Sequence, residues 1–214
     1  MGQAIRFYFD FASPYAYFAL DGIAQLAARY ERAVEWRPIL AWVVFKAHDI
    51  APPMDIPAKR AYFVIDMARS AAFHGVDYRH PSKLTLSSHL YARLYYAIAE
   101  QDPSQAQAFG REVFAAFFAR GEDISDVETV VRLAGLHGVG RPAAEEGLKG
   151  ARGRNFLAAA VEAAVGDKVC GSPFFIVDGE PFFGADRLAQ ISWRLQQIAQ
   201  SRGQLPSLDR DRRQ

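Results

Sequence analysis

A serine stands where a strand-like stretch near the N-terminus passes into a helix-like one. Four apolar residues before it alternate with the period of a strand: Ile5, Phe7, Phe9 and Phe11. Ser13-Pro14 then predicts a helix start, with serine as the N-cap and proline at the first helical position, and the helix is expected to run to about Tyr30. A helix start offers unpaired N–H groups and a partial positive charge. The Ser13 hydroxyl is therefore expected at a place that suits an anion, including a thiolate.

The elements predicted after this helix bring distant parts of the chain toward the serine. They are, in order, a strand over 33–39; a loop marked by Pro52, Pro53 and Pro57; helices over 58–75 and 87–100; a helix opened by Asp102-Pro103; a helix behind the capping box Ser125–Glu128, closing near Gly138; a helix over 155–166; two short strands within 169–183, joined at Asp178-Gly179; and a helix over 186–201. The strand-helix-strand opening predicts a parallel pair with a right-handed crossover. Residues 57–154 carry no strand signal, which predicts a helical insertion.

A strand-helix-strand unit followed, after an insertion, by helix-strand-strand-helix is the order of thioredoxin-like proteins. Ser172-Pro173 precedes the third strand, and in that fold this proline is typically cis and faces the start of the first helix. We therefore predict an α/β fold with a thioredoxin-like domain formed by residues 1–45 and 155–203. A helical insertion domain is expected over 46–154, and a C-terminal tail over 204–214.

Thiol-disulfide proteins of this fold begin that helix with Cys-x-x-Cys, but Ser13 and Ala16 stand at the two positions here. The single cysteine, Cys170, excludes an internal disulfide and a cysteine metal cluster, and it is expected to be a small buried residue rather than a reactive thiol. Redox exchange by the protein's own thiols at this site is therefore excluded. The site can instead hold the thiol of a bound molecule, for which glutathione is the obvious candidate.

Several segments resemble the DsbA-like, kappa-class glutathione transferases and in particular the bacterial 2-hydroxychromene-2-carboxylate isomerases. They are Phe7-Tyr-Phe-Asp-Phe-Ala-Ser-Pro-Tyr15, Val44-Phe-Lys46, Pro57-Ala-Lys-Arg-Ala-Tyr62, Gly171-Ser-Pro-Phe-Phe175 and Phe183-Gly-Ala-Asp-Arg-Leu188. The resemblance extends over almost the whole chain, and the first and last motifs together make it specific. It implies a thioredoxin-like fold with a large all-helical insertion, glutathione as a cofactor, a small aromatic substrate and a homodimer.

The resemblance also implies roles for particular residues. The cofactor-binding residues would be Ser13, Lys46, Ser172, Pro173, Gly184, Ala185, Asp186 and Arg187. Ser13 would contact the sulfur, and Ser172 would pair through its backbone with the cysteinyl part of the tripeptide. Asp186, at the start of the last helix, would bind the γ-glutamyl amino group, and neighbouring N–H groups would bind its carboxylate. Lys46 and Lys59 would serve anionic groups, Lys46 being the stronger candidate.

Two positions depart from the family pattern. Relatives often carry Ser, Asn or Gln where Ala185 stands, so one side-chain contact to the γ-glutamyl end is missing. Kappa-type proteins have an asparagine shortly before a Pro-Pro pair, and Ile50 stands at that place here. Both departures concern the affinity for glutathione and leave the expected fold unchanged.

Isomerases of this family interconvert a hydroxychromene carboxylate and an open-chain trans-benzylidenepyruvate. Rotation about the conjugated double bond requires that the bond be transiently single. A thiolate that adds to the conjugated carbon achieves this, and elimination then returns glutathione unchanged. The protein must keep the sulfur anionic and stabilise the enolate charge. The resemblance thus implies a glutathione-dependent cis-trans isomerase with Ser13 as the catalytic residue, and with Phe11, Tyr15 and Lys59 contacting the substrate.

Other interpretations stay open at this point. A kappa-type transferase or peroxidase would use the same sulfur site and consume glutathione. A non-catalytic thioredoxin-like binding module would not bind glutathione. Ser13 and Asp186 can each be a simple helix cap, and Lys46 and Lys59 can be solvated, with Lys59 able to pair with Asp55.

The composition narrows the classes of partner. Half of the residues are apolar and the net charge is +1, so there is no electrostatic case for nucleic-acid binding. The sequence shows no signal-peptide pattern and no apolar segment long enough to span a bilayer. No histidine pair has zinc-ligand spacing. We therefore expect a cytoplasmic protein with no nucleic-acid partner, no membrane partner and no metal.

Overall fold

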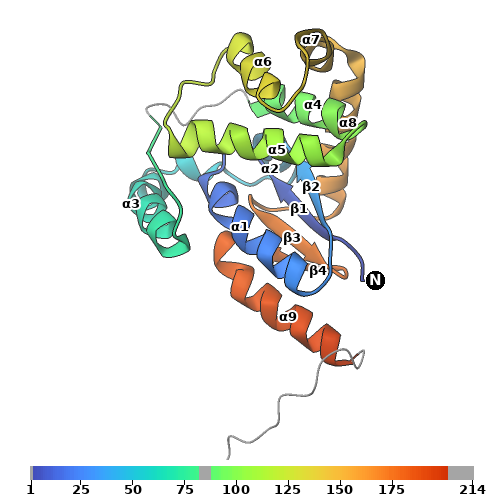
Figure 1. Ribbon diagram of the computed structural model, residues 1–214. Helices are drawn as coiled ribbons and strands as arrows, with labels where there is room; N and C mark the ends of the chain where they lie inside the picture. Colours follow the sequence, from blue (N-terminus) through green and yellow to red (C-terminus); the bar gives the residue numbers. More distant parts are fainter. Residues whose placement is uncertain (1, 82–87, 202–214) are drawn as a thin grey trace, which may run out of the picture.

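A four-stranded sheet lies at the centre of the computed structural model, which describes residues 2–81 and 88–201 (Figure 1). The strands, in chain order, are β1 (Ile5–Phe9), β2 (Val34–Pro38), β3 (Phe174–Val177) and β4 (Glu180–Phe183). They lie in the order β2-β1-β3-β4, with β1 parallel to β2 and antiparallel to β3, and with β3 antiparallel to β4. The parallel pair and the thioredoxin-like α/β fold predicted from the sequence are confirmed.

Helices cover both faces of the sheet. Among them are α1 (Pro14–Arg29), α2 (Ala41–Ala47), α8 (Ala151–Gly166) and α9 (Leu188–Ser201). On one face, α1 and α9 pack with Phe7 and Phe175, whose rings are stacked with their centroids 5.1 Å apart. On the other face, α2 and α8 pack with Tyr8, which is fully buried. Strand β1 is therefore buried on both sides and anchors the core.

The hairpin between β3 and β4 turns at Asp178-Gly179, as the sequence predicts. Both residues have positive φ values, 48° and 88°, which suit an Asp-Gly pair. The Arg32 guanidinium donates to both carboxylate oxygens of Asp178, at 2.7 and 2.9 Å. This turn lies at the end of the sheet where β1 begins, because Arg6 pairs with Ile176 near the end of β3. It is thus at the opposite end from Ser13.

Between β2 and β3, the described residues form helices and turns and no strand. After α2 come η1 (Pro53–Asp55), α3 (Pro57–His74), α4 (Ser88–Ala99), α5 (Pro103–Phe114), the π-helical turn η2 (Ala115–Ala119), α6 (Val127–Gly135), α7 (Arg141–Lys149) and α8. Figure 1 shows α4 to α7 gathered on one side of the sheet and α3 apart from them, near α1.

The division into domains stays a prediction. Residue 154, where the insertion is expected to end, lies inside α8. This helix contacts α4 of the insertion and also α2 and β2 beside the sheet. Ser87, residues 202 and 203 of the thioredoxin-like domain, and the expected tail over 204–214 lie outside the described residues.

Several helix starts differ from the sequence predictions. Helix α8 begins at Ala151 and not at 155, α9 begins at Leu188 and not at 186, and α7 has no predicted counterpart. Helix α2 is not predicted, because its N-cap, Leu40, is apolar and makes no side-chain capping bond. The expected capping box begins one residue too early. Asp126, and not Ser125, is the N-cap of α6, and its carboxylate accepts from the N–H of Thr129 at 2.8 Å. An aspartate accepts this bond as readily as a serine, so the two adjacent candidates are indistinguishable by type.

Replacing Gly153 by alanine is expected to lower the free energy of unfolding, measured by urea denaturation, by about 1–3 kcal/mol. A Cβ at this position of α8 would lie 2.7 Å from the carbonyl oxygens of Arg93 and Gly147, so the helices would have to separate. Gly166→Ala in the same helix is the matched control, because a Cβ there meets nothing within 4 Å. Its stability should be unchanged or slightly raised, and equal losses in the two variants would contradict the close packing.

Candidate functional site

The hydroxyl of Ser13 lies between the start of α1 and the loop before β3. It caps α1 by accepting a hydrogen bond from the N–H of Ala16 at 3.3 Å, and it donates one to the carbonyl of Ser172 at 2.9 Å. The Ser172–Pro173 peptide bond is cis, which confirms that prediction. The fold thus brings together two Ser-Pro pairs that stand far apart in the chain.

The same place offers backbone N–H groups that the protein leaves unused. Pro14 has no N–H, and the N–H of Ala16 is bonded to Ser13. Within residues 2–81 and 88–201, the N–H groups of Tyr15 and Ser172 have no hydrogen-bond acceptor. Two free N–H groups, a hydroxyl and the positive end of α1 can together stabilise an anion or a thiolate.

A buried carboxyl group, Asp10, stands directly behind this site and is not among the site residues that the sequence predicts. Its Oδ1 accepts from the N–H of Ala12 at 2.9 Å, and its Oδ2 accepts from the N–H of Ala41 at 2.8 Å. Its own N–H donates to Oγ of Ser172 at 2.9 Å. Asp10 is only 5% exposed. The signal in the sequence is a lone acid inside an aromatic stretch, which is costly to bury unless it has partners.

Opposing effects set the pKa of Asp10. Burial raises it above the ordinary value of 3.8, because the ionised form loses its hydration. Hydrogen bonds from Ala12, Ala41 and Ser88 favour the carboxylate and lower the pKa, but burial prevails. The charged form of Asp10 therefore depends on these three bonds.

The Gly-Ala-Asp-Arg segment lies against the cis-proline loop. The N–H of Gly184 donates to the carbonyl of Pro173 at 3.0 Å. Gly184 has a φ of 108°, and a Cβ there would lie 2.4 Å from Oδ1 of Asp186, so glycine is favoured. Asp186 lies in the turn η3 (Ala185–Arg187) ahead of α9 rather than in the helix, and its exposed carboxylate pairs with Arg187 at 3.0 Å. Ala185 itself is buried.

The aromatic residues near the site are arranged differently from the prediction. Phe11 is 1% exposed, and its ring packs against that of Phe114, so it belongs to the core and offers no surface to a substrate. Phe11 continues the alternation of Phe7 and Phe9, which is the pattern of a buried face. Phe183 is 51% exposed, and its ring lies beside Gly171, where a Cβ would come within 2.1 Å of it. Sequence reasoning missed Phe183, although it opens the Gly-Ala-Asp-Arg motif.

Three other candidates lie at the surface. Lys46 is on α2 and Lys59 is near the start of α3, and both are exposed. Neither has an ion pair within the described part of the chain, so Lys59 does not pair with Asp55. Cys170 is exposed, which corrects the prediction that it is buried, because Val169 beside it takes the core position. Partial burial raises the pKa of the Cys170 thiol, which disfavours its reactive thiolate form.

Tyr15 ties α1 to α3. Its hydroxyl donates to Oδ2 of Asp66 at 2.7 Å. Asp66 also accepts hydrogen bonds from Tyr62, Arg69 and Ser70 of its own helix. Burial acts to raise the pKa of Asp66, but these hydrogen bonds outweigh it and hold the pKa below its ordinary value of 3.8. The hydroxyl of Tyr15 is therefore already engaged, and α3 is held close to the start of α1.

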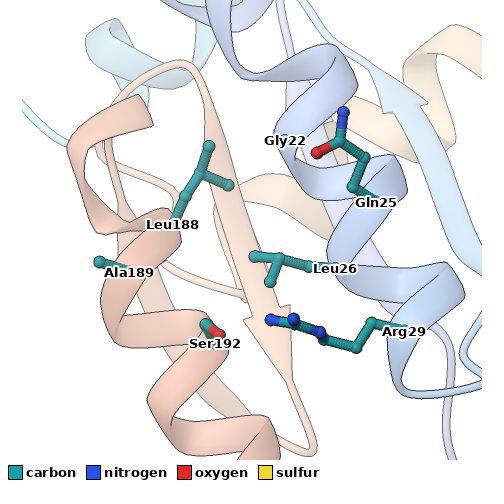
Figure 2. Close-up of a pocket in the computed structure, with 7 residues that line it drawn as sticks. All are labelled: Gly22, Gln25, Leu26, Arg29, Leu188, Ala189 and Ser192. Atoms are coloured by element: carbon teal, nitrogen blue, oxygen red, sulfur yellow. The ribbon is translucent and has the colours of Figure 1, made fainter. Parts of the chain in front are cut away.

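A groove of about 490 Å³ lies further along α1, between this helix and α9 (Figure 2). Figure 2 shows Leu26 and Arg29 reaching from α1 toward α9, with Leu188 and Ser192 on the opposite wall. None of the residues predicted for the glutathione site lines it. The groove is therefore not part of the candidate site.

A family model described as a DSBA-like thioredoxin domain matches residues 4–196. The chain belongs to this family. The 2-hydroxychromene-2-carboxylate isomerase of Pseudomonas putida is 29% identical over 207 residues, which cover 95% of this chain and 99% of that protein. Glutathione S-transferase kappa 2 of Caenorhabditis elegans is 28% identical over 205 residues, which cover 89% of this chain and 90% of that protein.

The solved structure of a 2-hydroxychromene-2-carboxylate isomerase is similar to this chain, with a TM-score of 0.84 and 26% sequence identity. The match covers 95% of this chain and 100% of that one. The resemblance carried by the sequence motifs is therefore confirmed at the level of the family and the fold.

Asp66→Asn is expected to lower the thermal midpoint at neutral pH and to match the unmodified protein at strongly acid pH. The folded-state pKa of Asp66 lies below 3.8, so its stabilisation is complete above that pH and is lost as the pH falls through the lower folded value. Thermal midpoints measured from pH about 7 down to about 2 should converge at the acid end. Asp21→Asn, which removes an exposed carboxylate paired with Arg111, should change the midpoint little at any pH. A difference for Asp66→Asn that persists in acid would contradict this.

Proposed function

We propose that the protein is a glutathione-dependent cis-trans isomerase that acts on 2-hydroxychromene-2-carboxylate or a related intermediate of aromatic degradation. The observation that carries the proposal is the Ser13 hydroxyl at the start of α1, hydrogen-bonded to Ser172 beside the cis proline. Serine and alanine occupy the two positions of a redox cysteine pair, so the site suits a thiol that is brought in. The similarity to the Pseudomonas putida isomerase over 95% of this chain supports the choice of reaction.

The residues around Ser13 fit a thiol-containing tripeptide. The Ser13 hydroxyl would turn from the Ser172 carbonyl to the sulfur, and the backbone of Ser172 would pair with the cysteinyl part as an added strand does. The exposed Asp186 carboxylate would bind the γ-glutamyl ammonium group. The N–H groups of Ala185 and Asp186, which have no acceptor within the described residues, would bind the neighbouring carboxylate.

Bound glutathione would supply a thiolate that adds reversibly to a conjugated carbon of the substrate, so that rotation about the former double bond becomes possible. The positive end of α1 and the Ser13 hydroxyl would keep the sulfur anionic. The free N–H of Tyr15 would stabilise negative charge as it develops nearby. A thiolate of the protein itself is not part of this mechanism, because burial raises the pKa of the Cys170 thiol and so disfavours its thiolate form.

We assign the aromatic wall of the substrate site to Phe183 in place of Phe11. Phe183 is half-exposed and stands beside Gly171, one residue before Ser172. A flat conjugated substrate would stack on this ring while its reacting carbon faces the sulfur near Ser13.

A kappa-class transferase or peroxidase activity is the second candidate, and the 28% identity to the Caenorhabditis elegans kappa 2 protein favours it. It would use the same sulfur site and consume glutathione. A non-catalytic thioredoxin-like module is the third candidate, and it would not bind glutathione at all.

The protein supplied with glutathione is expected to isomerise the chromene acid faster than it conjugates a generic electrophile, because the site holds the sulfur beside an aromatic wall. Both rates are measured on one preparation, with isothermal calorimetry for glutathione binding. Faster conjugation would assign the transferase activity. Neither activity together with no binding would leave only the non-catalytic module.

Ser13→Ala is expected to raise the pKa of the bound thiol and to lower turnover by roughly 100-fold, because the sulfur loses one hydrogen-bond donor. The pKa is measured from thiolate absorbance as the pH is varied. Asp126→Ala is the control, since it removes the N-cap of α6 at a similar cost of about 1 kcal/mol and lies outside the site. An unchanged pKa and rate in Ser13→Ala would overturn the assignment.

The expected homodimer and cytoplasmic location remain predictions. Among residues 2–81 and 88–201, no helix is both long and apolar enough to cross a membrane. Sedimentation velocity on the full chain tests the expected dimer directly.

A further inference from the structure

We propose that Asp10 is the positioning residue of the candidate site: it fixes the start of α2 and the cis-proline loop relative to Ser13. Asp10 touches neither the sulfur position nor a substrate, and it acts through the groups bonded to it. The inference deepens the proposed function and rests on it only where glutathione is the probe.

Asp10 bonds to both site serines through its main chain. Its carbonyl accepts from the N–H of Ser13 at 2.9 Å, and its N–H donates to Oγ of Ser172 at 2.9 Å. Its carboxylate accepts from the N–H of Ala12 in the turn between them. Rotation of this one residue would therefore move Ser13 and Ser172 relative to each other.

Asp10 also caps α2 in place of the helix's own N-cap residue. The N-cap residue of α2, Leu40, makes no side-chain capping bond, and the N–H of Ala41 is instead bonded to Oδ2 of Asp10 at 2.8 Å. A carboxylate at a helix N-terminus is favourable through both the hydrogen bond and the helix dipole. Helix α2, which carries Lys46, is thereby held to the end of β1.

Burial makes these bonds selective for one arrangement. Asp10 and Ser88, each 5% exposed, are the two buried polar residues in the described part of the chain. A carboxyl shut away from water must keep its partners or lose stability. Asp10 therefore joins β1, the start of α1, the start of α2 and the cis-proline loop in a single geometry.

Asp10→Asn tests the inference, with Asp178→Asn as the matched control. The asparagine oxygen can accept from only one of the two backbone groups, Ala12 or Ala41, that the carboxylate serves. The control makes the same chemical change in a carboxylate bonded twice to Arg32 at the other end of the sheet. Both variants are expected to have lower thermal midpoints.

Glutathione affinity, measured by calorimetry at a temperature where both variants are fully folded, separates positioning from a general loss of stability. Asp10→Asn is expected to bind glutathione about tenfold more weakly, and Asp178→Asn to bind within about twofold of the unmodified protein. Asp10→Ala, which keeps no acceptor, should bind more weakly than Asp10→Asn. Unchanged affinity in Asp10→Asn, or an equal loss in Asp178→Asn, would overturn the inference.

Amide hydrogen exchange gives a readout without glutathione. The N–H groups of Ser13 and Ala41 are expected to exchange about tenfold faster in Asp10→Asn and at the original rate in Asp178→Asn. If the unmodified protein does not bind glutathione, the proposed function fails, and this exchange measurement alone decides the role of Asp10. Exchange rates at Ser13 and Ala41 that are the same in Asp10→Asn as in the unmodified protein would then refute the positioning role.

Discussion

The antiparallel pairing of β1 with β3 is the constraint on which the site depends. Arg6 pairs with Ile176 and Tyr8 pairs with Phe174. Continued by two residues, the same register places Asp10 opposite Ser172, and the hydrogen bond between them is present. Because β1 is buried on both sides, a slip of one residue would move each of its side chains into the layer packed for the other face, so this burial fixes the position of the site as well as the core.

The chemistry of the site arises from backbone N–H groups that have no hydrogen-bond acceptor within the described residues. The start of α1 has a proline without an N–H and a tyrosine whose N–H has no acceptor among the described residues. In the described ranges 2–81 and 88–201, the N–H of Ser172 in the cis-proline loop and those of Ala185 and Asp186 in the turn before α9 also have no acceptor. Each of these segments ends or begins an element at the same edge of the sheet. Unsatisfied backbone groups gathered in this way are what a peptide-like ligand with two carboxylates and a thiol can use.

Local signals predicted much of the fold, because they depend on residues next to each other. Ser13-Pro14, Asp178-Gly179 and the Ser172-Pro173 pair each mark a backbone conformation that the structure adopts. Contacts between residues far apart in the sequence could not be predicted from such local signals. The cap of α2 comes from Asp10, which lies 31 residues earlier, so no local pattern marks this helix. Phe11 has the alternation of a strand residue, and alternation alone does not tell a core face from a ligand face.

Helix α8 runs without a break from the insertion to the face of the sheet. Hinge motion between two parts of a protein requires a few residues that absorb large changes in φ and ψ, usually in loops or at the ends of elements. On the C-terminal side, the expected boundary at residue 154 lies inside this continuous helix, and the nearest residue outside a helix is Gly150, between α7 and α8. Opening as two rigid halves at residue 154 would therefore require α8 to break.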